Sequence, residues 1–136
     1  MLACTQGPQF VFRILMVEDE ALLALPLEDF LNDQGYQVAW AANAVAALQL
    51  LANSAPPFAA LLTDIRLGVG HDGWFVAMHA RSLDHNMPVV YMSADSAANW
   101  QEQGVAGSAM LSKPFSLELL GSTLRGALGT PPYASS

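Results

Sequence analysis

The segment Arg13–Glu20, RILMVEDE, decides the fold of this chain. Its first part, Arg13–Val17, is an apolar run, and the acids Glu18, Asp19 and Glu20 follow it directly. A continuous apolar run of this length is typical of a strand that is covered on both faces, as in a parallel sheet. Because ligands of open parallel sheets bind at the carboxyl ends of the strands, acids in this place indicate a candidate binding site.

Strand-like and helix-like segments alternate along the remainder of the chain. Short apolar runs predict strands at 13–17, 36–41, 58–63, 88–92 and 108–112. Stretches with helical spacing of apolar residues predict helices at 21–33, 44–52, 73–83, 96–103 and 116–128. This alternation predicts an α/β fold: a single doubly wound domain with a parallel sheet and helices on both of its faces.

The domain is expected to span residues 13–128. An N-terminal extension at 1–12 precedes it, and a C-terminal tail or the start of a linker at 129–136 follows it. Pro26 stands inside the first expected helix, where proline removes a hydrogen bond, so we expect a kink there or a later start of the helix. The apolar residues of this helix that are expected to face the core are Leu22, Leu23, Leu27, Phe30 and Leu31.

Composition excludes several classes of protein. The chain has 136 residues, of which 53% are hydrophobic, and this suits one globular domain. Its formal net charge of −7 would repel phosphate backbones, so we expect no binding of nucleic acid. No apolar run approaches the roughly 18 residues of a membrane span, and the start has no basic region typical of a signal peptide. The single cysteine, Cys4, excludes a disulfide framework, and we expect a cytoplasmic protein.

Reactive side chains stand at the ends of further expected strands: Asp64 after the third, Ser93 after the fourth and Lys113 after the fifth. Clustered carboxylates would suit a hard cation such as Mg²⁺. A hydroxyl and an ammonium would suit a phosphoryl group, and Asp64 could then be the nucleophile that accepts it. Taken singly, an acidic loop or a capping Asp or Ser is ordinary, but four complementary strand ends favour a site.

These residues carry a resemblance that covers about residues 13–128. The chain resembles the receiver domains of response regulators in two-component signalling. The matching segments are Ile14–Glu20 (ILMVEDE), Leu62–Leu67 (LTDIRL), Asp72-Gly73, Ser93-Ala94 and Lys113–Phe115 (KPF). The resemblance implies a flavodoxin-like domain with five helices and a five-stranded parallel sheet of order 2-1-3-4-5, an order for which the receiver fold is a standard example.

The resemblance also implies a role for each site residue. Asp64 would accept a phosphoryl group from a phosphohistidine. Glu18 and Asp19 would hold Mg²⁺, directly or through water, together with the Asp64 carboxylate and the backbone carbonyl of Arg66. Ser93 and Lys113 would bind the phosphoryl oxygens.

The implied partners follow from these roles. The donor would be a sensor histidine kinase or a histidine phosphotransfer protein, and the output a downstream effector protein or domain. A homodimer through the fourth helix, fifth strand and fifth helix is a further expectation. The protein would be a phosphoacceptor switch with only weak self-phosphorylation and autodephosphorylation chemistry, rather than a conventional enzyme. It departs from the family at Met110, where an aromatic residue usually takes part in switching.

Three alternatives stay open. The chain could be a receiver-like interaction module that does not switch by phosphorylation. It could be an aspartyl-phosphate phosphatase, which Arg66 disfavours because that class has a second Asp in this position. Gly68, Gly70 and Gly73 match the GxGxxG pattern of dinucleotide sites, but they follow the third strand rather than the first.

Overall fold

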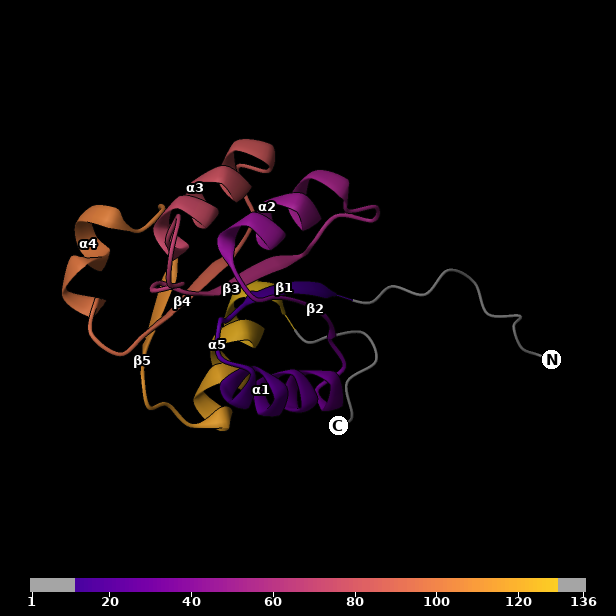
Figure 1. The fold of residues 1–136 in the computed structure, drawn as a ribbon. Helices are drawn as coiled ribbons and strands as arrows, with labels where there is room; N and C mark the ends of the chain where they lie inside the picture. Colours follow the sequence, from indigo (N-terminus) through magenta and orange to yellow (C-terminus); the bar gives the residue numbers. More distant parts are fainter. Residues whose placement is uncertain (1–11, 130–136) are drawn as a thin grey trace.

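Five parallel strands form the centre of the computed structural model, which describes residues 12–129 (Figure 1). The strands are β1 (Arg13–Val17), β2 (Gln37–Ala41), β3 (Ala60–Asp64), β4 (Val89–Ser93) and β5 (Ala109–Ser112). Their order in the sheet is β2-β1-β3-β4-β5. The helices are α1 (Ala21–Asp33), α2 (Ala44–Asn53), α3 (Gly73–Leu83), α4 (Trp100–Gln103) and α5 (Leu117–Leu128). The predicted fold is thereby confirmed.

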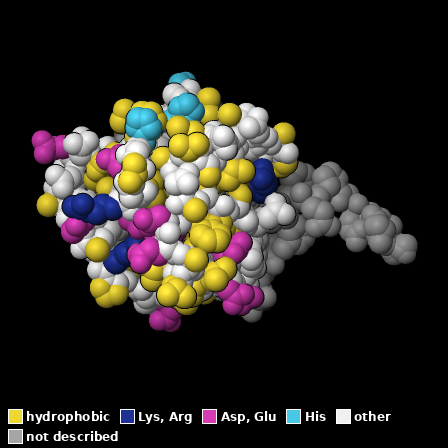
Figure 2. Space-filling model, viewed as in Figure 1, with side chains coloured by type: hydrophobic (Ala, Val, Ile, Leu, Met, Phe, Trp, Pro, Cys, Tyr) yellow, Lys and Arg dark blue, Asp and Glu magenta, His cyan; other side chains and the backbone are white. Residues whose placement is uncertain are grey.

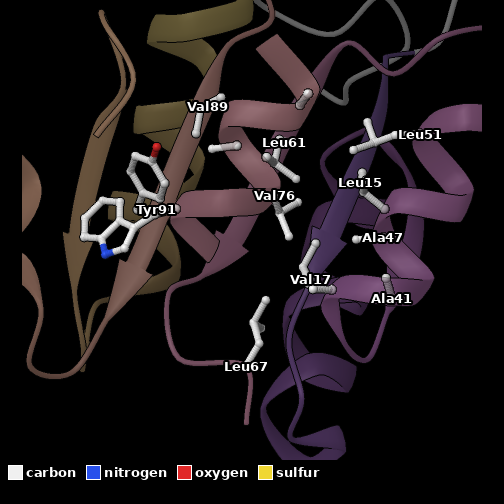
Figure 3. Close-up of a cluster of buried hydrophobic side chains, with 14 of the residues drawn as sticks. Leu15, Val17, Ala41, Ala47, Leu51, Leu61, Leu67, Val76, Val89 and Tyr91 are labelled. Carbon is white, nitrogen blue, oxygen red and sulfur yellow. The ribbon is translucent and has the colours of Figure 1, made fainter. Parts of the chain in front are cut away.

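Helices cover both faces of the sheet, so the core has two halves. α1 and α5 lie on one face, and α2 and α3 lie on the other (Figure 1). Alternate residues of each strand point into opposite halves. Leu15 and Val17 of β1 lie in the half covered by α2 and α3 (Figure 3). Ile14 and Met16 lie in the half covered by α1 and α5. The central strands β3 and β4 are buried along their whole length, as their continuous apolar sequences indicate.

Helix α1 differs from the expectation in two respects. It begins at Ala21, so a later start caused by Pro26 is wrong. Its buried residues are Ala24, Leu27 and Leu31, whereas Leu22 and Leu23 are 87% and 42% exposed. Ala24, Leu27 and Leu31 share one face of the helix, and Leu22 lies off that face. Leu23 lies one turn before Leu27 on the same side, but in the first turn, where it is only partly covered. Leu22 and Leu23 are therefore free to form a surface rather than a core.

The segment after β4 is less helical than its sequence predicts. A helix was expected over 96–103, but a 3₁₀ turn, Ala97–Asn99, occupies its first half and α4 itself is a single four-residue turn. Trp100 anchors this turn, because it packs against the core on the α2–α3 side and its Nε1 donates to Ser108 Oγ at 2.9 Å. Other predicted boundaries differ from the observed ones by a residue or two, and Ser116 caps α5 as expected by accepting from Leu119 N.

The expected extension at 1–12 and tail at 129–136 lie outside the described residues, apart from Phe12 and Gly129. Within residues 12–129, no helix is both long enough and apolar enough to cross a membrane.

Candidate functional site

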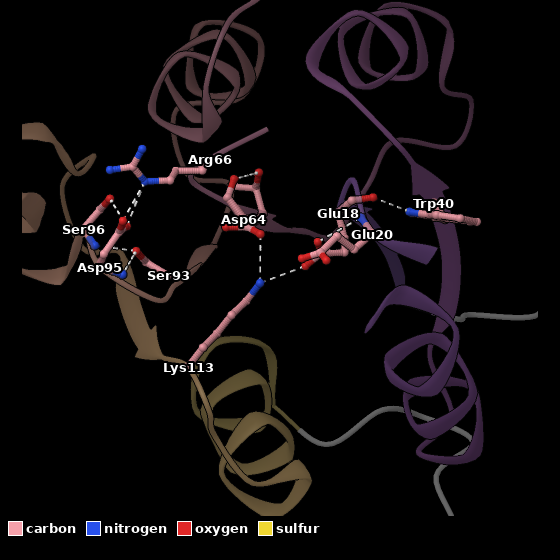
Figure 4. Close-up of polar contacts among 10 residues, drawn as sticks. Glu18, Glu20, Trp40, Asp64, Arg66, Ser93, Asp95, Ser96 and Lys113 are labelled. Atoms are coloured by element: carbon pink, nitrogen blue, oxygen red, sulfur yellow. Dashed lines mark hydrogen bonds and ion pairs between the residues drawn. The ribbon is translucent and has the colours of Figure 1, made fainter. Parts of the chain in front are cut away.

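Four strand ends meet at one edge of the sheet and bring the candidate residues together (Figure 4). Glu18 follows β1, Asp64 ends β3, Ser93 ends β4 and Lys113 follows β5. β1 pairs directly with β3, which places the two acidic strand ends side by side. A cavity of about 370 Å³ opens there, and its lining includes Asp19, Asp64, Arg66, Ser93, Asp95 and Lys113.

Lys113 joins the two buried carboxylates of the site. Its Nζ lies 2.8 Å from Asp64 Oδ2 and 3.0 Å from Glu18 Oε1. Burial by itself would lower the pKa of Lys113, but the hydrogen bonds and charges of Asp64 and Glu18 outweigh burial and raise that pKa above its usual value. The ammonium therefore stays charged and holds Asp64 and Glu18 beside each other.

Glu18 has no exposed surface. Burial raises the pKa of its carboxyl group to about 6; the neighbouring charge of Asp64 adds to the rise and Lys113 opposes it. Its Oε2 accepts a hydrogen bond of 3.2 Å from Glu20 N. Its backbone is held by β2, because Glu18 N donates to the Ala41 carbonyl at 3.1 Å and the Glu18 carbonyl accepts from Trp40 Nε1 at 2.8 Å.

The acids after β1 form a set of ligands that fits Mg²⁺. One carboxylate oxygen each from Glu18, Asp19 and Glu20 lies within 4.8 Å of the others. Carboxylate oxygens are the donors that this ion prefers. Gly68, in the loop after β3, comes so close that a side-chain carbon there would lie 3.8 Å from Asp19 Oδ2. Asp64 is not part of this carboxylate cluster but lines the adjoining cavity with Asp19.

Glu20 belongs to this carboxylate cluster, whereas the metal-ligand prediction named Glu18, Asp19, Asp64 and the carbonyl of Arg66. The available signal was the uninterrupted run of three acids.

Ser93 lines the cavity but directs its hydroxyl toward its own loop. Its Oγ accepts hydrogen bonds from Ser96 N at 2.6 Å and from Asp95 N at 3.2 Å. It makes no hydrogen bond with Asp64 among the described residues. In this conformation Ser93 therefore closes the turn after β4.

An ion pair links the loops after β3 and β4. Arg66 Nε lies 2.8 Å from Asp95 Oδ2 and 2.9 Å from Asp95 Oδ1 (Figure 4). The hydrogen bond from Arg66 lowers the pKa of Asp95, although both side chains are largely exposed. Sequence reasoning missed this pair, because only the sheet order brings the two loops together.

A second, apolar cavity of about 480 Å³ adjoins the site. Leu22, Leu23 and Pro26 of α1 line it together with Phe115, and Glu18 and Lys113 form its border with the acidic site. Figure 2 shows hydrophobic side chains beside intermixed acidic and basic ones on one face of the molecule.

The glycine pattern has a packing explanation. A side-chain carbon on Gly73 would lie 2.1 Å from the Asp64 carbonyl oxygen, so the start of α3 can approach β3 only with glycine at this position. This close contact accounts for Gly73 without a nucleotide.

Comparison with known proteins agrees with the fold. The family model described as the response regulator receiver domain matches residues 14–125. The chain belongs to this family. The resemblance recognised in the sequence is confirmed, and this receiver domain is of the kind found in bacterial two-component systems.

Relatives of this receiver domain include longer regulators. The response regulator MprA of Mycobacterium sp. (strain KMS) is 32% identical over 118 residues, which are 85% of this chain and 50% of that protein. The chain thus spans about half the length of these curated relatives.

Solved structures of receiver domains superpose closely on this one. A response regulator receiver protein from Sinorhizobium medicae WSM419 has a TM-score of 0.83 at 36% identity, covering 87% of this chain and 94% of that one. The chemotaxis protein CheY4 of Vibrio cholerae has a TM-score of 0.79 at 24% identity, covering 88% of this chain and all of that one, which shows the common fold.

Proposed function

We propose that this receiver domain accepts a phosphoryl group on Asp64 and thereby switches a protein interaction. The observation that carries this proposal is the pairing of Asp64 with Lys113, inside a cavity that Ser93 and the Glu18–Asp19–Glu20 cluster also border. A carboxylate beside a fixed ammonium is suited to take up a group that carries negative charge.

The reaction would use the free oxygen of Asp64. Among the described residues only Lys113 donates to its carboxylate, and it does so at Oδ2. Oδ1 can therefore attack the phosphorus of a phosphohistidine; the new O–P bond forms as the P–N bond breaks, and the imidazole leaves with the electron pair of the broken bond. Lys113 would neutralise charge on the phosphoryl oxygens, and Ser93 would donate to one of them after releasing its loop.

Mg²⁺ would be held by Glu18 and Asp19, directly or through water, together with the Asp64 carboxylate and the backbone carbonyl of Arg66. When bound, this ion supplies positive charge to the phosphoryl oxygens. The three carboxylates of the β1 loop fit it by their chemistry and spacing.

The partners remain those that the family implies. The phosphoryl donor would be a sensor histidine kinase or a histidine phosphotransfer protein, and the protein would work in the cytoplasm. The receiver would act on an effector protein or on a domain linked to it, an idea supported by the greater length of its relatives. A homodimer through α4, β5 and α5 stays a prediction; β5 is the edge strand of the sheet on that side.

Phosphoryl uptake by purified protein tests the proposal. With acetyl phosphate and Mg²⁺, intact-mass spectrometry should detect one added phosphoryl group on the unmodified chain. Asp64→Asn keeps the shape of the side chain but removes the nucleophile, and labelling should be lost entirely. Asp72→Asn is the matched control, because Asp72 caps α3 by accepting from Phe75 N and an Asn can do the same. Labelling that persists in Asp64→Asn, or that depends on Asp72, would contradict the assignment.

One observation favours a second candidate, a receiver-like module that does not switch. Met110 replaces the usual aromatic residue of β5 and packs with Trp100 and Val105 against the core. Such a module would bind beryllofluoride at Asp64 without any change elsewhere in the domain.

A further inference from the structure

Trp40 contacts the acidic site from the neighbouring strand. It lies in β2, opposite Met16 of β1, and its ring packs against the core on the α1–α5 side. Its Nε1 donates a hydrogen bond of 2.8 Å to the backbone carbonyl of Glu18 (Figure 4). The N–H is the only polar group of an indole, and here it donates to the carbonyl of Glu18, the first residue of the carboxylate cluster.

This hydrogen bond completes the attachment of the acidic loop to β2. Glu18 N donates to Ala41 O, which extends the ladder between β1 and β2 by one residue. β2 ends at Ala41, and Asn43 already caps α2 by accepting from Ala46 N. The Trp40 side chain therefore provides the donor for the Glu18 carbonyl where the strand stops. The Glu18 carbonyl belongs to the peptide unit between Glu18 and Asp19, so the hydrogen bond from Trp40 orients that unit directly.

The direction of Asp19 depends on that peptide unit. Asp19 is exposed, and its carboxylate accepts no hydrogen bond from any residue within 12–129. Glu18, in contrast, is held by Lys113 and by Glu20 N through its own side chain. Only the backbone therefore places the Asp19 carboxylate beside those of Glu18 and Glu20, and Trp40 fixes this backbone.

We propose that Trp40 is a positioning residue for the carboxylates that bind Mg²⁺, an assignment that rests on the proposed function. Its indole N–H orients the Glu18–Asp19 peptide so that Asp19 points at the ion site. Loss of such outer contacts weakens metal sites by about tenfold or more, although every ligand is still present.

The test separates the hydrogen bond from the packing of the ring. Trp40→Phe keeps an aromatic ring in the core and removes the donor. Replacing Trp40 with benzothienylalanine keeps the shape of the indole and removes only the N–H. Mg²⁺ affinity is measured by NMR titration of the Asp19 and Glu20 amides, and the free energy of unfolding is measured in parallel without metal. Both variants should bind Mg²⁺ about tenfold more weakly, and the benzothienylalanine protein should unfold like the unmodified one.

Trp100→Phe is the matched control. Its Nε1 also makes one hydrogen bond, to Ser108 Oγ at 2.9 Å, but in α4 rather than at the acidic loop. Its Mg²⁺ affinity should equal that of the unmodified protein. Native Mg²⁺ affinity in the benzothienylalanine protein would overturn the role of Trp40.

Asp19→Ala distinguishes this result from a failure of the proposed function. It should abolish the Mg²⁺ response of the Glu20 amide. If Asp19→Ala binds Mg²⁺ as before, the ion site itself is misplaced and both assignments are wrong. If Asp19→Ala loses binding while both Trp40 variants keep it, only the role of Trp40 is wrong.

Discussion

Glu18 carries the least favourable charge of the site. It is fully buried beside Asp64, and one Lys113 ammonium serves both carboxylates. A carboxyl group whose pKa rises from 4.5 to about 6 on folding costs about 2 kcal/mol once it is ionised. The ionised carboxylate of Glu18 therefore lowers the free energy of unfolding.

Glu18→Gln should accordingly raise the free energy of unfolding by about 1–2 kcal/mol at pH 7 in the absence of Mg²⁺. The pKa of Glu18 is higher in the folded state, so its protonation stabilises the fold, and this stability is lost as pH rises from 4.5 through about 6. The amide stays neutral and keeps an oxygen for Lys113. Urea denaturation in EDTA at pH 7 and at pH 4 measures the difference between the two proteins, which should vanish at the lower pH.

Glu20→Gln is the control for this experiment, because Glu20 is exposed. Its stability should lie within about 0.5 kcal/mol of the unmodified protein at both pH values. A Glu18→Gln protein that is less stable at pH 7 would mean that the Lys113 pairing outweighs the burial of the charge.

Gly73 sets how closely α3 approaches the phosphoacceptor. Gly73→Ala would bring a carbon to 2.1 Å from the Asp64 carbonyl oxygen and 2.9 Å from Ile65 Cα. Both neighbours are backbone and cannot turn aside, so the helix must shift. We expect a loss of at least about 2 kcal/mol in the free energy of unfolding, measured in urea.

Gly126→Ala in α5 is the contrasting substitution, because nothing lies within 4 Å of the added carbon. It should stabilise the protein by about 0.5 kcal/mol through the helix preference of alanine. Equal changes in the free energy of unfolding for Gly73→Ala and Gly126→Ala would contradict this expectation. They would show that the start of α3 can move away from β3 at little cost.

Among the elements, we predict that the segment from β4 through α4 moves most on phosphorylation. Its first turn is closed by Ser93 Oγ, which would have to leave Ser96 N and Asp95 N in order to reach a phosphoryl group on Asp64. The helical part is only a 3₁₀ turn followed by four residues. Such a short helix has little stability of its own and depends on Trp100 for its attachment.

Hydrogen exchange with and without beryllofluoride should therefore change most in residues 93–105, with a smaller change around Met110. Movement of Ser93 would also disturb Asp95 and its pair with Arg66, which extends the change to the loop after β3. Mass spectrometry of peptic fragments locates the difference. A largest change in α1 would refute this placement, and binding of the mimic with no change anywhere would favour the module that does not switch.

At the scale of the whole molecule, the parallel sheet brings the residues of the site together. Parallel strands end at a common edge, and the order β2-β1-β3-β4-β5 puts β1, β3 and β4 in sequence there. Glu18 and Lys113 are far apart in the chain, yet Lys113 Nζ lies 3.0 Å from Glu18 Oε1. At the same edge, the leucines of the first turn of α1 line the apolar cavity that borders Glu18 and Lys113.

Much of this was determined by the sequence alone. Apolar patterns predicted the five strands and helices α1, α2, α3 and α5, since burial on one or both faces imposes those patterns on apolar residues. The helix expected over 96–103 is instead a 3₁₀ turn and one four-residue turn. Acids, a hydroxyl and a single lysine at strand ends identified the residues that the structure gathers at one edge, because the ends of parallel strands must meet.

The tertiary structure decided what local patterns do not encode. Helical spacing predicted that Leu22 and Leu23 are buried in the core. Burial also depends on how much of a helix the rest of the protein covers, and the first buried residue of α1 is Ala24. The turn of Ser93 toward Ser96, the pairing of Arg66 with Asp95 and the hydrogen bond from Trp40 to Glu18 all join atoms through space. Such contacts depend on which strands are neighbours and on the direction of each side chain, and neither is written in the spacing of residues along the chain.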